Sequence, residues 1–507
     1  MTTSHALADQ ALGDHPSSAP VWERPVIVAV LLAAALLVPL SVLGNRMSLA
    51  LVALPFLFAL AFFFVRWPSL GFPCMVVASL LVPFSVGTGT QSGINISIIL
   101  VALLGGLWLF DMIAGVRQIE LVPSSTTTPL LAMMGVSLLA FGFGQIRWLP
   151  VRPVSFQAQM GGLMIFILSP VAFLLTANQL RDIRSLKWMT GLFVGLGGIF
   201  VAGMLVPTLR VRSLDLFQRA VQDAMFWTWI VAISASQSLM NSKLRIRWRI
   251  ALGLVALGAF YFTIVLRQSW TSGWLPAMVA IMVIALVRKP RWVVGAMVLA
   301  VFFAILQPSF FQNLFLGGDN EYSLTTRLEA WRILIQIIGL NPVLGLGPAN
   351  YYAMTPLFNI LGYSVNFNSH NNYIDIVAQI GLVGLVCFLW FGWALLKTIW
   401  RLKDQMPDGF SHAFIYGALG GVVATFFAGL FGDWVLPFVY NVGLEGFRAS
   451  SLAWIFMGSV IALEQIQARS VSAEPELKAD SLLPELRVTT TAQSWQLRRL
   501  AKKLRGE

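Results

Sequence analysis

Cysteine and charge are both scarce in this sequence, and each shortage excludes a class of protein. The chain of 507 residues contains two cysteines, Cys74 and Cys387, and both lie in apolar stretches. Two such cysteines form neither a disulfide framework nor a zinc-binding pattern. Only 11% of the residues are charged, whereas 57% are hydrophobic and the mean hydropathy is +0.77. A soluble globular protein cannot bury that much apolar surface, so the composition predicts an integral membrane protein.

Long apolar runs recur from Val26 to Leu463, and their length and pattern predict transmembrane helices. A helix needs about 20 apolar residues to cross the hydrocarbon core. The runs are continuous rather than alternating, which argues against a transmembrane β-barrel. We therefore expect an all-α polytopic protein with about 14 spans, at residues 26–43, 48–65, 70–86, 94–113, 128–144, 160–177, 188–206, 224–240, 250–266, 273–287, 291–306, 371–396, 412–431 and 449–464.

These spans define the predicted organisation of the chain. No signal-peptide pattern precedes the first run, so we read it as a retained span. The expected regions are a cytoplasmic tail at 1–25, helices over 26–306, an outer loop at 307–369, helices over 370–464 and a basic cytoplasmic tail at 465–507.

The formal net charge of +12 reflects an uneven distribution of basic residues. Because basic loops stay in the cytoplasm, we interpret the charge as a topology signal rather than as a nucleic-acid-binding surface. With an even number of spans, both termini are cytoplasmic and every lysine falls on that side. The outer side then carries arginine only: Arg46, Arg147, Arg152, Arg210, Arg212, Arg219, Arg267, Arg327, Arg332 and Arg448. Arginine binds phosphate and carboxylate through a planar pair of N–H donors, so these outer arginines predict a site for an anionic substrate. For any single arginine, anchoring to lipid headgroups is the alternative.

Charged residues are almost absent from the middle of the predicted spans. Asp111, Asp375 and Glu464 lie near predicted span ends. Coupled transporters usually need ionisable groups inside the membrane, so this shortage argues against a proton-driven carrier. It leaves a lipid flippase open.

The longest predicted connection is the outer loop at 307–369, and loops of that length are uncommon unless they are functional. Apolar residues at helical spacing predict an amphipathic helix over 323–340 that lies on the membrane, with Arg327 and Glu329 on its wet face. Residues 341–348 follow, with prolines and glycines that end the helix and permit unusual backbone angles.

His370 follows directly after this loop and is the only histidine in the predicted outer loops. It precedes the next span, where the positive end of the helix dipole should lower its pKa and keep the ring neutral. A neutral imidazole can accept a proton from a hydroxyl group, so His370 is the candidate catalytic base, with a structural role as the alternative. Asn368, Asn371 and Tyr373 flank it and are expected to support it.

Three sequence elements around this loop resemble the signature of the O-antigen ligase and O-antigen polymerase superfamily of bacterial membrane glycosyltransferases. They are Arg327–Trp331 with the following segment 341–347, the pair His370-Asn371 at the start of a span, and the glycine-containing continuation at 381–385. Their order and spacing match the family over roughly residues 260–400, and the rest of the chain matches in hydropathy.

The resemblance implies a GT-C-like helical fold and an inverting transfer without metal or cofactor. The donor would be a glycan on undecaprenyl diphosphate at the outer leaflet, and the acceptor a sugar hydroxyl on a glycan or a lipid-linked molecule. The family reading makes His370 the base and the outer arginines the diphosphate ligands, for which we expect Arg267 first, then Arg212 and Arg219, and Arg327 in the loop helix. Many members read Ser-Arg where this chain reads Arg267-Gln268-Ser269.

Several functions fit these observations. The favoured one is a polymerase or ligase in the bacterial inner membrane with its site on the periplasmic or extracellular side, where negative charge on a leaving diphosphate would be stabilised by fixed cations. The alternatives are a flippase or exporter of lipid-linked glycan, and a non-catalytic partner of other polysaccharide-assembly proteins. Polymerase and ligase are not distinguished, because they differ in acceptor rather than in chemistry.

Overall fold

The computed structural model describes residues 70–88, 93–116, 121–146, 151–267, 270–307 and 319–470, together with a few single residues between 62 and 67. Those six ranges belong to one compact unit, Ser69–Glu507. The predicted tail at 1–25, the span at 26–43, most of the span at 48–65 and the C-terminal tail after residue 470 lie outside the described residues.

The described chain is mostly helical, as its composition predicts. The principal helices are α3 (Gly71–Leu81), α4 (Ile96–Phe110), α5 (Thr127–Gly144), α6 (Phe156–Gln179), α7 (Ile183–Leu205), α8 (Arg210–Leu216), α9 (Ala224–Met240), α10 (Ile246–Phe260), α11 (Thr271–Arg288), α12 (Pro290–Leu306), α14 (Asp319–Ile338), α15 (Asn372–Leu402) and α16 (Phe410–Ala428). A final helical span covers Leu444–Ser470. Within the described residues, nine helices are long and apolar enough to cross a membrane, and α3 and α9 are apolar but shorter. The count of about 14 spans therefore stays a prediction.

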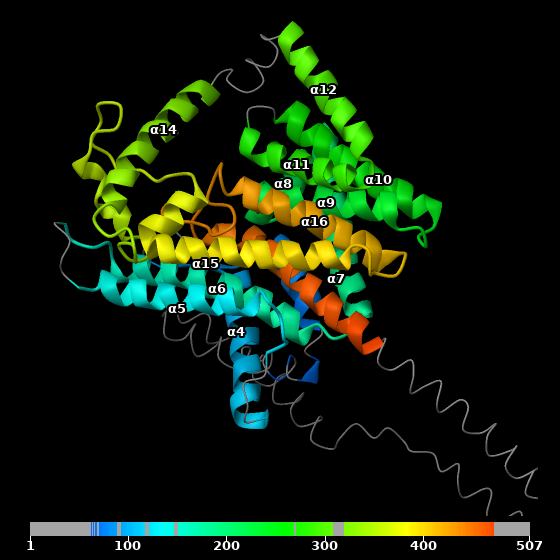
Figure 1. The fold of residues 1–507 in the computed structure, drawn as a ribbon, viewed down its shortest axis with the longest axis horizontal. Helices are drawn as coiled ribbons and strands as arrows, with labels where there is room; N and C mark the ends of the chain where they lie inside the picture. Colours follow the sequence, from blue (N-terminus) through cyan, green and yellow to red (C-terminus); the bar gives the residue numbers. More distant parts are fainter. Residues whose placement is uncertain are drawn as a thin grey trace, which may run out of the picture. The chain divides into compact units, whose positions relative to one another are not determined.

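Helix α9 lies at the centre of a helical bundle. Helices α7, α10, α11 and α16 pack around it, and Figure 1 shows α16 beside α9 and α11. Small residues allow these close approaches. A Cβ atom at Gly420 would lie 2.5 Å from the carbonyl oxygen of Ala280, and one at Gly421 would lie 2.8 Å from the ring of Trp229. Side chains on all faces of α9 are buried, so this short helix is a core element.

Helix α15 packs against α5 on one side and α16 on the other (Figure 1). It is broken at Gly381, where φ is 74° and ψ is −179°, a conformation that only glycine adopts readily. The carbonyl oxygens exposed by the break accept hydrogen bonds from the loop at 341–349: Leu346 N donates to Ala378 O at 2.9 Å and Gly347 N donates to Gln379 O at 3.0 Å. Two of the motifs predicted from the sequence therefore bind each other.

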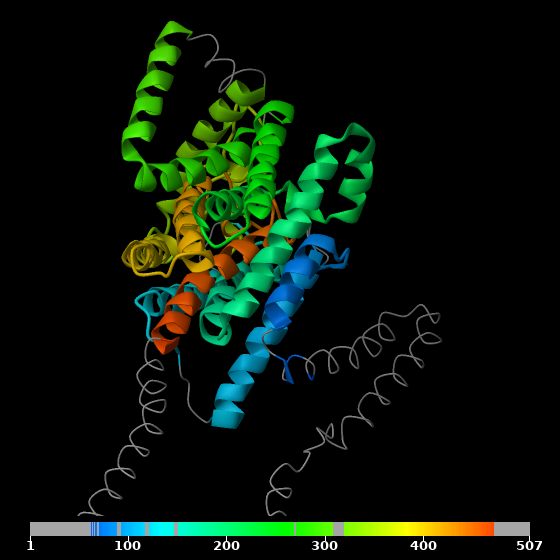
Figure 2. The same cartoon turned by 90° about the vertical axis from the view of Figure 1, so that its right-hand side faces the viewer.

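A short hairpin follows α3, where the sequence predicted that the span would continue to residue 86. The hairpin pairs β1 (Ser85–Gly87) with β2 (Gly93–Asn95) in antiparallel fashion. Arg448 holds the end of α3, because its guanidinium donates to the carbonyl oxygens of Val82 and Phe84 at 2.9 and 2.7 Å and pairs with Glu445 at 2.8 Å. Figure 2 shows α3 beside α7, and the two helices pack together.

Helix α14 occupies the middle of the predicted outer loop. Ala330, Leu334 and Ile337 are buried on one side of it, whereas Leu324 and Leu328 are exposed. The loop helix expected at 323–340 thus corresponds in sequence to α14, but its placement on a membrane surface stays a prediction.

The bundle has two ends with different basic residues. At one end, the starts of α9 and α11 meet the chain that follows α16, close to His370; we call this the histidine end. At the other, Gln237 Nε2 donates to Phe410 O at 3.1 Å and Arg288 Nη1 donates to Leu239 O at 2.9 Å, beside Lys187 and Lys243; we call this the lysine end. The length of α9 separates them by about 25 Å, close to the hydrocarbon thickness of a bilayer.

Candidate functional site

A cavity of about 310 Å³ opens at the histidine end, and we call it the histidine cavity. It brings together residues from five separate stretches of the chain. Its lining consists of Arg219, Gln222, Asp223, Trp270, Ser272, Arg327, His370, Phe431, Trp434, Asn441, Val442 and Gly446. Three of the residues predicted from the sequence, His370, Arg219 and Arg327, therefore share one cavity.

The backbone of His370 is held in an unusual conformation just before α15. Its φ is 47°, in the left-handed region that residues other than glycine rarely adopt. The amide of His370 donates to Asn368 Oδ1 at 3.1 Å, and the preceding carbonyl, of Ser369, accepts from Trp331 Nε1 at 2.7 Å. Ser369 Oγ also donates to the buried Asp375 at 2.8 Å. These contacts tie the histidine loop to both α14 and α15.

The ring of His370 is neutral at physiological pH. Burial and, to a smaller extent, the nearby positive charge of Arg327 together lower the pKa of His370 to about 4. The lowered pKa agrees in direction with the sequence-based prediction, but its causes are burial and Arg327 rather than the helix dipole. A neutral imidazole can exchange a proton with a hydroxyl group at any pH well above 4.

Asn441 and Asp433 orient this ring from the loop after α16. Asn441 Nδ2 lies 3.1 Å from His370 Nδ1 and donates to Asp433 Oδ1 at 2.5 Å. Phe438 N donates to the other carboxylate oxygen, Asp433 Oδ2, at 2.7 Å. Burial raises the pKa of Asp433 to about 6. With the Asn441 amide nitrogen facing Nδ1, the ring proton lies on Nε2.

Arg327 and Arg219 supply positive charge to the cavity. Arg327 extends from α14, is half-buried and donates from Nη1 to Phe431 O at 3.3 Å. Its Nε atom is buried and has no hydrogen-bond partner among the described residues. Arg219 lies in the 3-10 turn η4 (Arg219–Gln222), directly before α9. Burial raises the pKa of the neighbouring Asp223 well above its usual value, which favours the uncharged form of that carboxyl group.

The remaining predicted site residues lie outside the cavity. Arg267 reaches its edge, because its guanidinium lies 5.2 Å from the ring centroid of the lining residue Trp270. Arg212 is exposed on α8 and does not line the cavity. Asn371 caps α15 by accepting from the amides of Tyr373 and Ile374, and Tyr373 donates from its hydroxyl group to Phe426 O at 2.7 Å. Asn371 and Tyr373 thus position the helix that follows His370.

Sequence reasoning missed Asp433, Asn441 and the two tryptophans of the cavity. Asp433 and Asn441 come after the predicted span at 412–431, in a connection that carries none of the recognised motifs. The signal was an acidic residue, Asp433, between apolar segments on the predicted outer side. Trp270 and Trp434 meet edge to face, with ring centroids 6.3 Å apart, and form an aromatic wall.

Among the described residues, no three histidine, cysteine or acidic side chains converge as a metal site would require. The lining of the histidine cavity offers two guanidinium groups and further hydrogen-bond donors that can bind an anion. Such an arrangement suits phosphate or diphosphate, which arginine binds with parallel N–H donors.

Comparison with known families agrees with this part of the chain. Residues 252–389 match a family model described as O-antigen ligase. The matched stretch contains Trp270, Arg327 and His370 but ends before Asp433 and begins after Arg219. No curated protein matches the chain.

Proposed function

We propose that this chain, whose residues 252–389 match a family model described as O-antigen ligase, is a membrane glycosyltransferase that moves a glycan from undecaprenyl diphosphate to a sugar hydroxyl. The observation that carries the proposal is the shared cavity of a neutral histidine, His370, and two arginines, Arg219 and Arg327. The reaction needs a proton acceptor and a stabiliser of negative charge within reach of one substrate, and this cavity contains both.

The proposed step forms one carbon–oxygen bond and breaks another. The acceptor hydroxyl oxygen attacks the anomeric carbon while its proton passes to Nε2 of His370. The bond between the anomeric carbon and the diphosphate oxygen breaks, and the electron pair leaves with undecaprenyl diphosphate. Attack from the face opposite the leaving group inverts the anomeric centre. General base catalysis of this kind contributes about 10²- to 10⁴-fold to the rate.

Arg219 and Arg327 are the proposed ligands of the diphosphate. Negative charge grows on the leaving group as the glycosidic bond breaks, and preorganised cations in a partly dry cavity stabilise that charge. The unpartnered Nε of Arg327 leaves a donor available for a phosphate oxygen. Burial raises the pKa of Asp223, which favours its uncharged form and leaves the charge of the two arginines less opposed.

The base role requires that Nε2 of His370 be free of its proton. If the Asn441 amide turns by half a rotation, its oxygen faces Nδ1 and the ring proton moves to Nδ1. Asp433 must then be protonated and donate to that same oxygen. Its raised pKa of about 6 makes the protonated form accessible near neutral pH. Asn441 and Asp433 are therefore proposed as positioning residues that select the tautomer of His370.

The lipid part of the donor has a suitable path beside the cavity. Leu257, Val265 and Leu266 are exposed along α10 and its continuation, which end at Arg267. A polyprenyl chain in the bilayer could lie along this apolar surface while its diphosphate reaches the cavity. We assign the cavity to the periplasmic or extracellular side of a bacterial inner membrane, because lysines gather at the opposite end of the bundle.

The decisive experiment uses purified full-length protein and a defined undecaprenyl-diphosphate oligosaccharide. The wild type should consume this donor, giving a ladder of products if it is a polymerase, or a single addition to a supplied acceptor if it is a ligase. His370→Ala should reduce transfer by about 10²-fold or more. His412→Ala is the matched control, because His412 lies at the start of α16, at the lysine end, and it should transfer at the wild-type rate.

The alternative function, a flippase or exporter, gives a different result in the same material. A flippase would move labelled lipid across vesicle membranes without consuming it, and His370→Ala would not change the chemical state of the donor. Full transfer by His370→Ala would reject the base assignment.

A further inference from the structure

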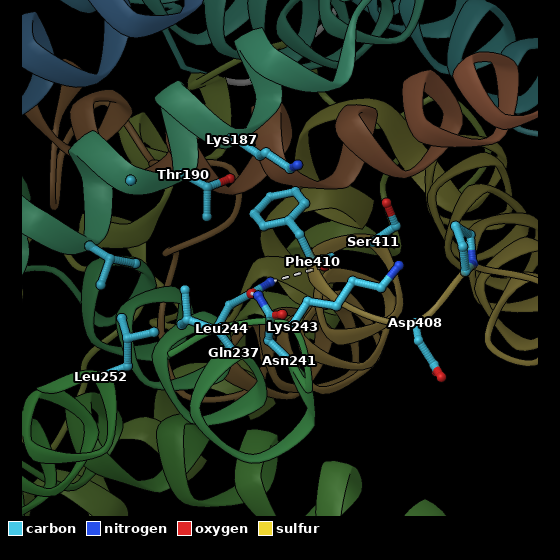
Figure 3. Close-up of a pocket in the computed structure, with 13 residues that line it drawn as sticks. Lys187, Thr190, Gln237, Asn241, Lys243, Leu244, Leu252, Asp408, Phe410 and Ser411 are labelled. Carbon is cyan, nitrogen blue, oxygen red and sulfur yellow. Dashed lines mark hydrogen bonds between the residues drawn. The ribbon is translucent and has the colours of Figure 1, made fainter. Parts of the chain in front are cut away.

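A second cavity, of about 550 Å³, lies at the lysine end of the bundle, and we call it the lysine cavity (Figure 3). It is larger than the histidine cavity and shares no residue with it. Its lining comes from α7, the end of α9, the start of α10, and the turn that leads into α16: Lys187, Thr190, Gly191, Val194, Gln237, Asn241, Lys243, Leu244, Leu252, Pro407, Asp408, Phe410 and Ser411.

Two lysines give the cavity its charge. Lys187 Nζ lies 5.8 Å from the ring centroid of Phe410, and Lys243 approaches from the loop after α9. Among the described residues, neither ammonium group lies within ion-pair distance of a carboxylate. Asp408 stands on the rim, as Figure 3 shows, and offsets part of this charge without pairing with it.

The backbone is shaped to accommodate the second lysine. Gly409 has a φ of 113°, which a residue with a side chain rarely adopts. A Cβ atom there would lie 3.0 Å from Cδ of Lys243. The glycine therefore leaves room for the stem of Lys243 beside the cavity.

Thr190 independently indicates that this cavity can bind a polar group. Its side chain is 3% exposed, and its Oγ1 atom has no hydrogen-bond partner among the described residues. Buried hydroxyl groups almost always have a partner, and leaving one unpaired is unfavourable. Figure 3 shows Thr190 one turn from Lys187 on α7, on the same side of the cavity.

The rest of the lining is apolar. The apolar walls are formed by Val194, Leu244, Leu252 and the Phe410 ring. A small water-soluble anion would gain no binding energy from these walls. A ligand that contacts the lysines, Thr190 and the apolar walls together needs an anionic head that accepts hydrogen bonds, and a hydrocarbon part. Basic pockets between transmembrane helices bind such headgroups on the cytoplasmic side of membranes.

We propose that the lysine cavity binds an anionic phospholipid of the leaflet opposite the one that meets the histidine cavity. The phosphate lies between Lys187 and Lys243, accepts the hydrogen bond of Thr190, and places the first part of its acyl chains against Val194, Leu244 and Leu252. This binding does not depend on the proposed glycosyl transfer.

The test is photolabelling of the purified full-length protein in phosphatidylcholine vesicles. The probe is a photoreactive phosphatidylglycerol with the reactive group near the start of an acyl chain, and labelled peptides are mapped by mass spectrometry. Labels should fall near residues 190–194 and 244–252. The double variant Lys187→Gln, Lys243→Gln should lower labelling by about 30-fold, since each basic residue contributes about fivefold at a membrane surface.

Matched variants separate this site from general surface charge. Lys289→Gln removes an exposed lysine at the same end of the bundle and should label like the wild type. Lys187→Arg with Lys243→Arg keeps the charge and should retain most labelling. Thr190→Val should raise the melting temperature of lipid-free protein, because it removes an unpaired hydroxyl, and should weaken labelling.

Three outcomes would overturn the proposal. Equal labelling by a phosphatidylcholine probe would show that the charge of the head is irrelevant. Displacement of the lipid probe by inorganic phosphate would identify a site for a small anion instead. Unchanged labelling in the Lys187→Gln, Lys243→Gln variant would place lipid binding elsewhere.

Discussion

The histidine cavity and the lysine cavity lie at opposite ends of α9, and each contains two basic side chains of a different kind. Arg219 and Arg327 at one end are planar donors beside a titratable ring, whereas Lys187 and Lys243 at the other are compact charges beside apolar walls. Arginine can align two donors on a phosphate, and lysine acts as a point charge on a flexible stem. Both cavities carry positive charge, but only the histidine cavity adds a titratable ring with oriented partners, and the proposed reaction depends on that difference.

The two ends also differ in how their polar groups are held. At the histidine end, Asp433 and Asn441 form a chain of hydrogen bonds that ends on His370. At the lysine end, Gln237 and Asn241 bond to each other and to the backbone, and Thr190 Oγ1 has no partner among the described residues. A reaction site needs a fixed proton path, whereas a lipid site needs only a head-binding group and an apolar wall.

Arg327→Gln is expected to give the largest contrast between the two ends. Loss of one preorganised cation at a leaving group should lower transfer by about 10²- to 10³-fold, while phosphatidylglycerol labelling at the lysine cavity stays unchanged. The transfer rate of Arg327→Lys should lie between those of the wild type and Arg327→Gln, because lysine keeps the charge but loses the planar pair of N–H donors.

Arg332→Gln is the matched control for that variant. Arg332 lies on the same helix, its side chain is 74% exposed, and its pair with Glu329 is a long 3.8 Å contact. Transfer should stay near the wild-type rate. If both variants lose transfer equally, the effect comes from α14 as a whole and not from the cavity.

Asp433→Ala tests whether the hydrogen-bond chain selects the form of His370. Transfer should fall by about 10- to 100-fold, because Asn441 loses the partner that orients its amide. Asp433→Asn should retain more activity, since an amide can donate to Asn441 while still accepting from Phe438 N. Initial rates with saturating donor measure both, and equal losses in the two variants would contradict the positioning role.

The acid limit of transfer follows from the lowered pKa of His370, about 4. A group with that pKa is still mostly neutral at pH 5, whereas a histidine with an ordinary pKa of about 6.5 would be roughly 30-fold depleted in its neutral form. Protonation of Asp433 below its pKa of about 6 favours the base tautomer, so transfer should hold or rise from pH 7 to pH 5. A decline centred near pH 6.5 would refute this assignment.

The smallest expected effect distinguishes Arg267 from Arg212. Arg267→Ala should lower transfer about two- to fivefold, because it removes a cation from the face of Trp270 at the cavity edge. Arg212→Ala should stay within about twofold of wild type, as an exposed residue away from the cavity. The same rate assay measures both variants. A larger loss in Arg212→Ala than in Arg267→Ala would indicate that the diphosphate binds near α8 and not at the histidine cavity.

Part of the site could be predicted because its residues are close in the sequence. Arg327, Asn368 and His370 lie in or beside one long predicted loop, and local patterns there were enough to select them. Arg448 illustrates the opposite case: it was grouped with the outer arginines, yet it is buried and holds the end of α3. A count of arginines per side cannot distinguish a ligand from a packing residue, because the two differ only in which atoms surround the side chain.

The order of amino acids was enough to predict a helical protein with many apolar spans, and a histidine that stands between a long loop and the start of one span. Those conclusions follow from run length, hydropathy and short motifs, which are local properties. Three features became visible only in the folded chain: Arg219 rather than Arg212 lines the cavity, Asn441 reaches His370, and Gly381 breaks α15 where the loop at 341–349 binds. These contacts join residues far apart in the chain, and the packing of the helices sets which side chains face each other.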